Sequence, residues 1–477
     1  MPKKAVNKTT ILILLALAQF MVILDSSIVN VAIPAINREL HFSPENLQWI
    51  VTAYTLTFGG FLLLGGRAAD LFGRRRMFTF GLIAFTSASF IGGLSQNSGM
   101  LVALRAIQGL SAAFMSPAAL SIVINTFKQG KERNRALGVW GGVAAGGAAA
   151  GLLFGGVLTE YLGWRWDFFV NVPIGLAVIF FVQRIIPESK ADMEHQHLDL
   201  PGAVLATSGL MILVYALVKA PEKGWGSSST ILLLLSSVVL LAGFIFNETR
   251  SKQPLVPLSI FKLRNLSAAN LVQLPITAGM LSMFFFLSLY VQTVMHYSPV
   301  RSGLAFLPVT VVIGISSAIV SILVGKIGYK IPMTIAPLFI TGGLLIFSRL
   351  PVHGTYLGNV LPGLIVMALG LGFSFVSITI AATSGVSKHQ SGLASGILNT
   401  SQQIGGALGL AILSGVFAAS IKSSTIAGSH GAVAQVAGYH DAFMVASFFT
   451  LAASIIAAVG VKHVRGEHLD AEPAPAV

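Results

Sequence analysis

Asp25 is the residue of this sequence that packing alone explains least, because it lies inside a long apolar segment. The segment Ile11–Ile36 (ILILLALAQFMVILDSSIVNVAIPAI) contains no other charged side chain. A carboxylate at the centre of a membrane-spanning helix costs about 2.5–3.5 kcal/mol on insertion scales. Such acids are kept mostly where they pair with a cation, bind a ligand or carry protons. Asp25 is therefore the first candidate for a functional site.

Arg105 is the basic residue that best matches Asp25 in depth. At about 1.5 Å per residue, Arg105 lies roughly 8 Å below the outer edge of a hydrocarbon layer ~30 Å thick. On the same scale Asp25 lies roughly 21 Å from the inner edge, so the two depths nearly coincide. We expect the two side chains to meet, directly or through water, with Gln108 one turn from Arg105. Two interpretations stay open: an exchangeable proton site, or a permanent ion pair that joins two helices.

The elements that must position these residues are membrane-spanning helices. Of the 477 residues, 54% are hydrophobic and 10% are charged, a balance typical of an integral membrane protein. Apolar runs recur along the whole chain, and helices satisfy the backbone groups within them. The sequence predicts an all-α protein with fourteen spans at about residues 11–36, 47–66, 77–95, 100–127, 136–159, 168–186, 200–218, 229–247, 266–295, 302–325, 332–349, 357–383, 391–420 and 441–461.

The basic residues predict how these spans are oriented. With the N-terminus inside, most of the 30 lysines and arginines fall in cytoplasmic loops, as the positive-inside rule requires. This topology explains the formal net charge of +13, so we expect no nucleic-acid partner. An even number of spans returns the C-terminus to the cytoplasm, and both termini are predicted to be cytoplasmic.

An internal repeat divides the chain. Glycines of the fifth predicted span recur in the thirteenth at one constant offset, which pairs Gly138 with Gly396, Gly147 with Gly405 and Gly151 with Gly409. Two six-helix bundles are implied, separated by an inserted pair of helices. The predicted boundaries are 1–190 for the N-terminal bundle, 191–265 for the inserted helices and a cytoplasmic linker, 266–465 for the C-terminal bundle and 466–477 for a disordered tail.

Several segments of the chain resemble one family. Gly66–Met77 (GRAADLFGRRRM) is similar to the signature cytoplasmic loop of the major facilitator superfamily. Five further segments resemble the fourteen-span drug:proton antiporters of that superfamily. In chain order they are Leu24–Pro34 (LDSSIVNVAIP), Trp49–Leu56 (WIVTAYTL), Leu101–Gly109 (LVALRAIQG), Trp164–Gly175 (WRWDFFVNVPIG) and Gly392–Gly409 (GLASGILNTSQQIGGALG). The resemblance implies the major facilitator fold with two extra helices, and export of drugs in exchange for protons.

Two of these segments have a physical interpretation of their own. A charge cluster in the loop after the second span predicts a latch between helices on the cytoplasmic side, built from Gly66, Arg67, Asp70, Gly73, Arg74 and Arg75. The alternative is that these charges only set topology. A second set, Gly147, Gly151 and Gly155, predicts close helix packing. The family normally has a proline after the glycine at the position of Gly151, but this chain has Leu152, so we expect packing rather than a kinked gate.

Polar and aromatic side chains in the spans are candidates for a substrate cavity. Buried amides in a bilayer need partners and tend to face the interior, whereas aromatic rings suit varied lipophilic compounds. The candidates are Asn30, Tyr54, Gln108, Trp140, Gln273, Tyr290, Asn399, Gln402 and Gln403. The alternative for each is packing, or hydrogen bonding between helices.

The chain lacks the signals of other function classes. It has no cysteine and no GxxxxGK[ST] phosphate loop, and the segment Glu194–His197 has no helical spacing that would organise a metal site. We therefore expect no metal, no cofactor other than the proton, and no enzymatic activity. An ion gradient is left as the driving force, with the proton acting through Asp25.

The predicted function is proton-coupled export of lipophilic or cationic drugs from the cell by alternating access. The expected partners are a small lipophilic substrate and membrane lipid, and the protein is expected to work as a monomer in the cell membrane. Alternatives are an exporter of a lipid or an endogenous secondary metabolite, a nutrient importer, and a receptor or scaffold that transports nothing.

No second acid is expected in the membrane portion. Glu39, Glu160, Asp167, Glu222 and Asp441 are predicted to lie outside the spans or at their edges. This weakly disfavours substrates with two positive charges. The family usually has an apolar residue at the position of Asp167.

Overall fold

A computed structural model describes residues 8–43, 46–128, 131–189, 199–251, 254–386 and 391–462. These residues form helices joined by short connections, and they contain no β-strand. The predicted all-α class is therefore confirmed. The segment Glu194–His197 and the predicted tail at 466–477 lie outside the described residues.

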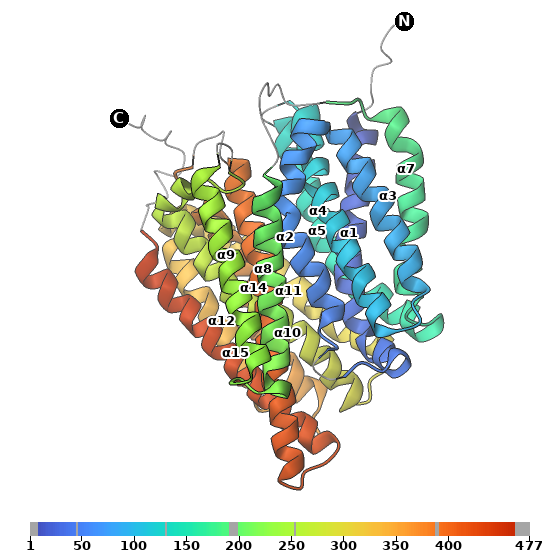
Figure 1. Ribbon diagram of the computed structural model, residues 1–477, viewed down its shortest axis with the longest axis vertical. Coiled ribbons are helices and arrows are strands. Elements are labelled where there is room, and N and C mark those ends of the chain that lie inside the picture. Colours follow the sequence, from blue (N-terminus) through green and yellow to red (C-terminus); the bar gives the residue numbers. More distant parts are fainter. Residues whose placement is uncertain are drawn as a thin grey trace, which may run out of the picture.

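The first part of the chain contains six long helices and one short one. They are α1 (Lys8–Leu40), α2 (Trp49–Phe72), α3 (Arg74–Gly93), α4 (Ser98–Thr126), α5 (Lys131–Tyr161), α6 (Trp166–Phe169) and α7 (Asn171–Ile185). The long ones lie together in Figure 1. The four-residue α6 continues almost directly into α7. Together these two helices fill the place of the sixth predicted span.

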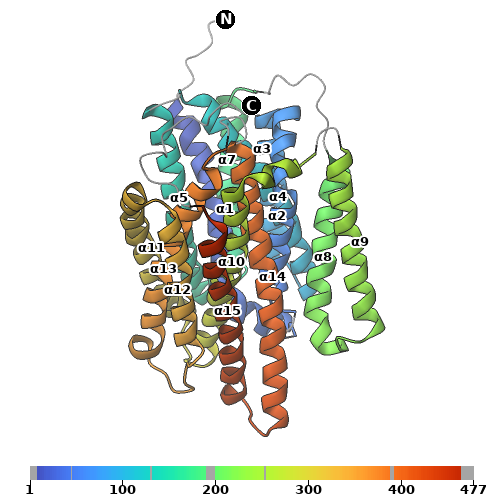
Figure 2. The same cartoon turned by 90° about the vertical axis from the view of Figure 1, so that its left-hand side faces the viewer.

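The remaining elements follow in the same pattern. They are α8 (Leu200–Lys223), α9 (Ser228–Arg250), the 3₁₀ turn η1 (Leu258–Lys262), α10 (Arg264–Thr293), α11 (Pro299–Ile327), α12 (Lys330–Phe347), the π-helical turn η2 (Tyr356–Val360), α13 (Leu361–Thr383), α14 (Ser391–Ile426) and α15 (Ala432–Gly460). In Figure 2, α8 and α9 stand together at the edge of the molecule, beside α2 and α14.

Twelve stretches of the described helices are long and apolar enough to cross a membrane. The helices α3 and α5 coincide with two further predicted spans but fall outside this set. Three consecutive arginines begin α3 and lower its hydropathy. The count of membrane-spanning helices depends on how these two are assigned.

Glycines bring helix backbones close together where the sequence predicts close packing. A Cβ atom at Gly151 would lie 2.8 Å from the carbonyl oxygen of Leu24, and one at Gly155 would lie 2.7 Å from that of Ile28, so α5 packs directly on α1. Gly405 on α14 makes a similar contact, because an added Cβ there would lie 2.4 Å from the carbonyl oxygen of Leu274 on α10. Small side chains permit this approach in the absence of a hydrophobic driving force within lipid.

Near the C-terminal end of α1, hydrogen bonds join the first group of helices (α1–α7) to the second group (α10–α15). Ser288 donates to the carbonyl oxygen of Asn30 (2.7 Å), and Gln292 donates to that of Val31 (2.9 Å), which ties α10 to α1. Near them, the backbone amide of Val300 donates to Glu160 (2.8 Å) and ties α11 to α5. These bonds close the molecule at one end.

The glycine contacts give a stability prediction. Gly65→Ala places a Cβ 2.0 Å from the carbonyl oxygen of Ala113, so α2 and α4 must separate, at an expected cost of about 1–3 kcal/mol. Gly314→Ala is the matched control, because a Cβ there has nothing within 4 Å. Unfolding of the detergent-solubilised protein measures both. Equal stability of the two variants would contradict the close packing of α2 on α4.

Candidate functional site

The Asp25 carboxylate lies at the centre of a buried hydrogen-bond network. Its Oδ2 accepts from Arg105 Nη1 (2.6 Å), and its Oδ1 accepts from Gln108 Nε2 (2.9 Å) and Asn171 Nδ2 (2.8 Å). The side chains of Asp25 and Arg105 are 0% and 1% exposed. The predicted meeting of Asp25 and Arg105 is confirmed as a direct ion pair.

Arg105 also contacts α2 and a second residue of its own helix. Its Nε donates to the carbonyl oxygen of Ile50 (2.9 Å), and Nη1 donates to Gln108 Oε1 (3.0 Å). The guanidinium lies over the Tyr54 ring, 4.4 Å from the ring centroid, a distance at which cation–π attraction is effective. Gln108 donates in turn to Ser89 on α3 (2.8 Å). The network thus joins α1, α2, α3, α4 and α7.

A buried ion pair of this kind is balanced between large opposing energies. Removing two charges from water is costly, and the attraction offsets that cost only with good geometry and satisfied hydrogen bonds. Asp25 accepts three hydrogen bonds and Arg105 has three polar partners, so both conditions are met. Any change in the charge of Asp25 would therefore disturb five helices together. Whether Asp25 exchanges a proton stays a prediction.

Sequence reasoning missed two members of this network. Asn171 stands at the first position of α7, and Ser89 lies in the third predicted span. Neither has a charge that would mark it in the sequence. The amide of Asn171 was the available signal, because it interrupts an apolar run in the segment Trp164–Gly175 that carries the family resemblance.

Asp167 lies at the edge of a candidate membrane-spanning segment (Trp166–Ile185), as expected, but its side chain is buried. It is 0% exposed and accepts a hydrogen bond from Thr159 (2.6 Å). The turn at Gly163 accounts for this burial. With φ at +91°, which glycine adopts without strain, this residue turns the chain so that α6 packs back against α1, α3 and α5. A pattern of apolar runs cannot show this reversal.

The predicted latch forms an ion pair across the turn between α2 and α3. Asp70 Oδ1 accepts hydrogen bonds from both Arg74 Nε (3.0 Å) and Arg74 Nη2 (2.8 Å). Gly73 lies between them with φ at +112°. Arg67 donates to the carbonyl oxygen of Pro254 (3.3 Å), so the loop also contacts the linker before α10.

Glu188 is a further member of this cluster that the sequence analysis did not identify. Its Oε1 accepts from the backbone amide of Arg75 (3.0 Å), and Oε2 lies 3.7 Å from Nε of the same residue. A Cβ at Gly73 would lie 2.7 Å from Glu188 Oε1, and the φ of +112° at this residue favours glycine. At the same end of the molecule, the hydrogen bond from Lys8 holds the pKa of Glu132 below its usual value.

The residues predicted to line a cavity do not form one group. Tyr54 and Gln108 belong to the Asp25 network, whereas Tyr290 donates to the carbonyl oxygen of Pro351 (2.7 Å) inside the second group of helices. Asn30 and Gln273 are buried, Trp140, Gln402 and Gln403 are half-buried, and Asn399 is exposed. Their role in binding substrate stays a prediction.

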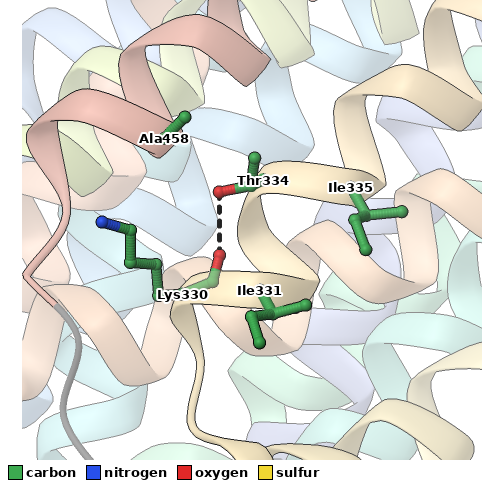
Figure 3. A pocket seen from close by; sticks show the side chains of 5 residues that line it. All are labelled: Lys330, Ile331, Thr334, Ile335 and Ala458. Atoms are coloured by element: carbon green, nitrogen blue, oxygen red, sulfur yellow. Dashed lines mark hydrogen bonds between the residues drawn. The ribbon is translucent and has the colours of Figure 1, made fainter.

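Two surface hollows lie away from all of these residues. One, of about 240 Å³, is lined by Lys330, Ile331, Thr334, Ile335 and Ala458 (Figure 3). The other, of about 340 Å³, lies around the start of α10 near Arg264. The described part of the chain contains no group of three or more His, Cys, Asp or Glu side chains arranged to hold a metal.

Comparison with known proteins places this architecture in a family. The family model described as Major Facilitator Superfamily matches residues 15–410. A puromycin resistance protein from Streptomyces alboniger is 38% identical over 451 residues, which cover 94% of this chain and 89% of that protein. The cephamycin export protein CmcT from Amycolatopsis lactamdurans is 38% identical over 462 residues, which cover 96% and 93% of the two chains.

Solved structures show the same fold at low sequence identity. A bacterial homologue of the human lysosomal transporter Spinster, in an inward-facing and unoccupied conformation, aligns with a TM-score of 0.67 at 15% identity and covers 95% of this chain and 96% of its own. The POT family transporter PepTSo aligns with a TM-score of 0.71 at 15% identity, and the alignment covers 94% of this chain and 97% of that chain. The chain therefore belongs to the major facilitator superfamily and is a multi-pass transporter of the cell membrane rather than an enzyme.

Proposed function

We propose that this protein exports lipophilic or cationic drugs in exchange for protons, with Asp25 as the proton-binding site and Arg105 as its partner. The observation that carries the proposal is the complete burial of this ion pair at the junction of five helices. A proton on Asp25 would cancel the attraction to Arg105 and leave a buried cation without its counter-ion. The helices would then favour a different packing, which is the coupling that an antiporter requires.

The contacts support a topology with both termini in the cytoplasm. Arg67, at the end of α2, contacts Pro254 in the linker before α10, and Arg264 at the start of α10 donates to the carbonyl oxygens of Val459 and Gly460. The end of α15 thereby lies near the start of α10, and the start of α1 is drawn at the same end of the molecule as the end of α2 (Figure 1). Basic residues gather at this end, which favours the cytoplasmic side.

The same proposal includes fourteen membrane spans in two six-helix bundles. The helices α3 (20 residues) and α5 (31 residues) pack against the other helices of the first part of the chain and are long enough to cross a hydrocarbon layer ~30 Å thick, so they are counted as spans. The bundles comprise 1–190 and 266–465, with the inserted helices and linker at 191–265. Hydrogen bonds between α1 and α10 and between α5 and α11 then close the outer side, as in an inward-facing state of alternating access. The cluster around Asp70 would be the latch on the inner side.

The relatives support the proposed class of substrate. Their printed names concern resistance to puromycin and lincomycin, and export of cephamycin and tetracenomycin C. Drug export in exchange for protons needs no cofactor and no partner besides substrate and lipid. The name of the cephamycin export protein favours one second candidate, which is export of an endogenous secondary metabolite.

The first prediction for this function concerns Asp25→Asn. In inverted membrane vesicles with an imposed pH gradient, this variant should lose gradient-driven substrate movement, because an amide cannot take up and release the coupling proton. Glu39→Gln is the matched control. It removes a carboxylate from the same helix, but Glu39 is exposed and pairs with Arg165, so transport should continue. Undiminished transport by a folded Asp25→Asn variant would refute the proposed proton site.

A second prediction concerns the energetic coupling between Asp25 and Arg105. Arg105→Gln alone leaves a buried carboxylate without a cation, at an expected cost of about 3–5 kcal/mol in unfolding free energy. The double variant Asp25→Asn with Arg105→Gln should cost less than the sum of the two single changes, because no charge is left unpaired. Unfolding of the four proteins in detergent measures this coupling. Additive costs would mean that the two side chains do not interact energetically.

A third prediction concerns the latch. Asp70→Asn weakens the pair with Arg74, so it should slow transport while binding of substrate is retained. Glu132→Gln is the control, since it removes an exposed carboxylate at the same end that pairs with Lys8. Transport rates and binding are measured separately on each variant. If Asp70→Asn transports as fast as the control, the cluster only sets topology.

A further inference from the structure

Asp167 is a second acid buried close to the Asp25 network. It is 0% exposed, and Thr159 donates to its Oδ2 (2.6 Å). It lies four residues before Asn171, and both residues stand on the continuous path of α6 and α7, so they are one turn apart. Asn171 itself donates to Asp25. Asp25, Asn171 and Asp167 therefore follow one another toward the outer end of the first group of helices.

The charges around Asp167 do not compensate a carboxylate. Asp25 and Arg105 neutralise each other in their ion pair. At the rim, Arg165 pairs with Glu39, and Glu160 accepts from the amide of Val300. Among the described residues that pack against α6, no salt bridge includes Asp167. An ionised Asp167 would add an unpaired negative charge beside Asp25, and burial of such a charge costs several kcal/mol.

Two buried oxygen atoms without hydrogen-bond partners also disfavour an ionised Asp167. Asp167 Oδ1 and Asn171 Oδ1 are both buried without a hydrogen-bond partner. Each is an acceptor when Asp167 is ionised, so neither can satisfy the other. A proton on Asp167 Oδ1 would change one acceptor into a donor. It would remove the uncompensated charge and allow a hydrogen bond across the turn to Asn171.

We propose that Asp167 is a second proton-binding site, which holds a proton while Asp25 is ionised and exchanges it with Asp25. Transfer breaks the O–H bond on Asp167 and forms one on Asp25, through an intervening water molecule that takes up one proton as it releases another. The sum of charges on the two acids and Arg105 stays the same. Asp167, now ionised, regains its proton from the outer side. The exchange rests on the proposed function of Asp25, but the resident proton does not.

Infrared spectroscopy of the purified full-length protein tests the resident proton directly. A protonated carboxyl group has a carbonyl stretch that an ionised one lacks. At neutral pH, Asp167→Asn should remove one such band, whereas Asp25→Asn and the control Glu39→Gln should leave it. Thr159→Val should shift the band without removing it, because it deletes the hydrogen bond to Oδ2. This last variant keeps the test valid if Asp167→Asn fails to fold.

The outcomes separate the two proposals. If the band is unchanged in both Asp167→Asn and Thr159→Val, Asp167 is ionised and the inference is wrong. If the band is lost but the pH profile of transport in Asp167→Asn equals that of the unmodified protein, the proton is static and the exchange is refuted. A flattened pH profile with substrate binding retained supports the exchange. If Asp25→Asn still transports in response to the gradient, the proposed function fails, while the infrared result for Asp167 stands.

Discussion

The ion pair between Asp25 and Arg105 constrains how the first group of helices can pack. Neither charge is stable alone in an apolar interior, so each helix that supplies a partner must be held at hydrogen-bonding distance. Gln108, Asn171 and the carbonyl oxygen of Ile50 complete the set of partners and draw in α2, α4 and α7. The packing of these helices therefore depends on the protonation state of the Asp25 carboxyl group.

The rest of the fold is arranged around this constraint. Gly151 and Gly155 let α5 lie against the backbone of α1, the helix that carries Asp25. Farther along α1, the carbonyl oxygens of Asn30 and Val31 accept bonds from α10. The helix that holds the central acid therefore also forms a seam between the two groups of helices. A shift of α1 would therefore change both the Asp25–Arg105 ion pair and the hydrogen bonds to α10.

Much of this organisation was predictable because it depends on local composition. Apolar runs marked the helices, and the recurring glycines marked the seam that the structure shows on α1 and α10. Depth along two helices was enough to pair Asp25 with Arg105, since a helix rises by a fixed amount per residue. The positions of Asp167, Asn171 and Glu188 were not predictable in this way. Their neighbours come from distant parts of the chain, and no spacing in the sequence encodes those contacts.

The sequence by itself determined that the chain is a bundle of membrane helices, that one acid and one arginine lie at matching depths, and that glycines recur at one constant offset. The tertiary structure alone decided which polar groups share the interior. The turn at Gly163 folds α6 inward and buries Asp167, and the approach of α7 brings Asn171 to Asp25. The physical reason is that burial and hydrogen bonding belong to the packed assembly of helices, whereas hydropathy and helical rise belong to each segment separately.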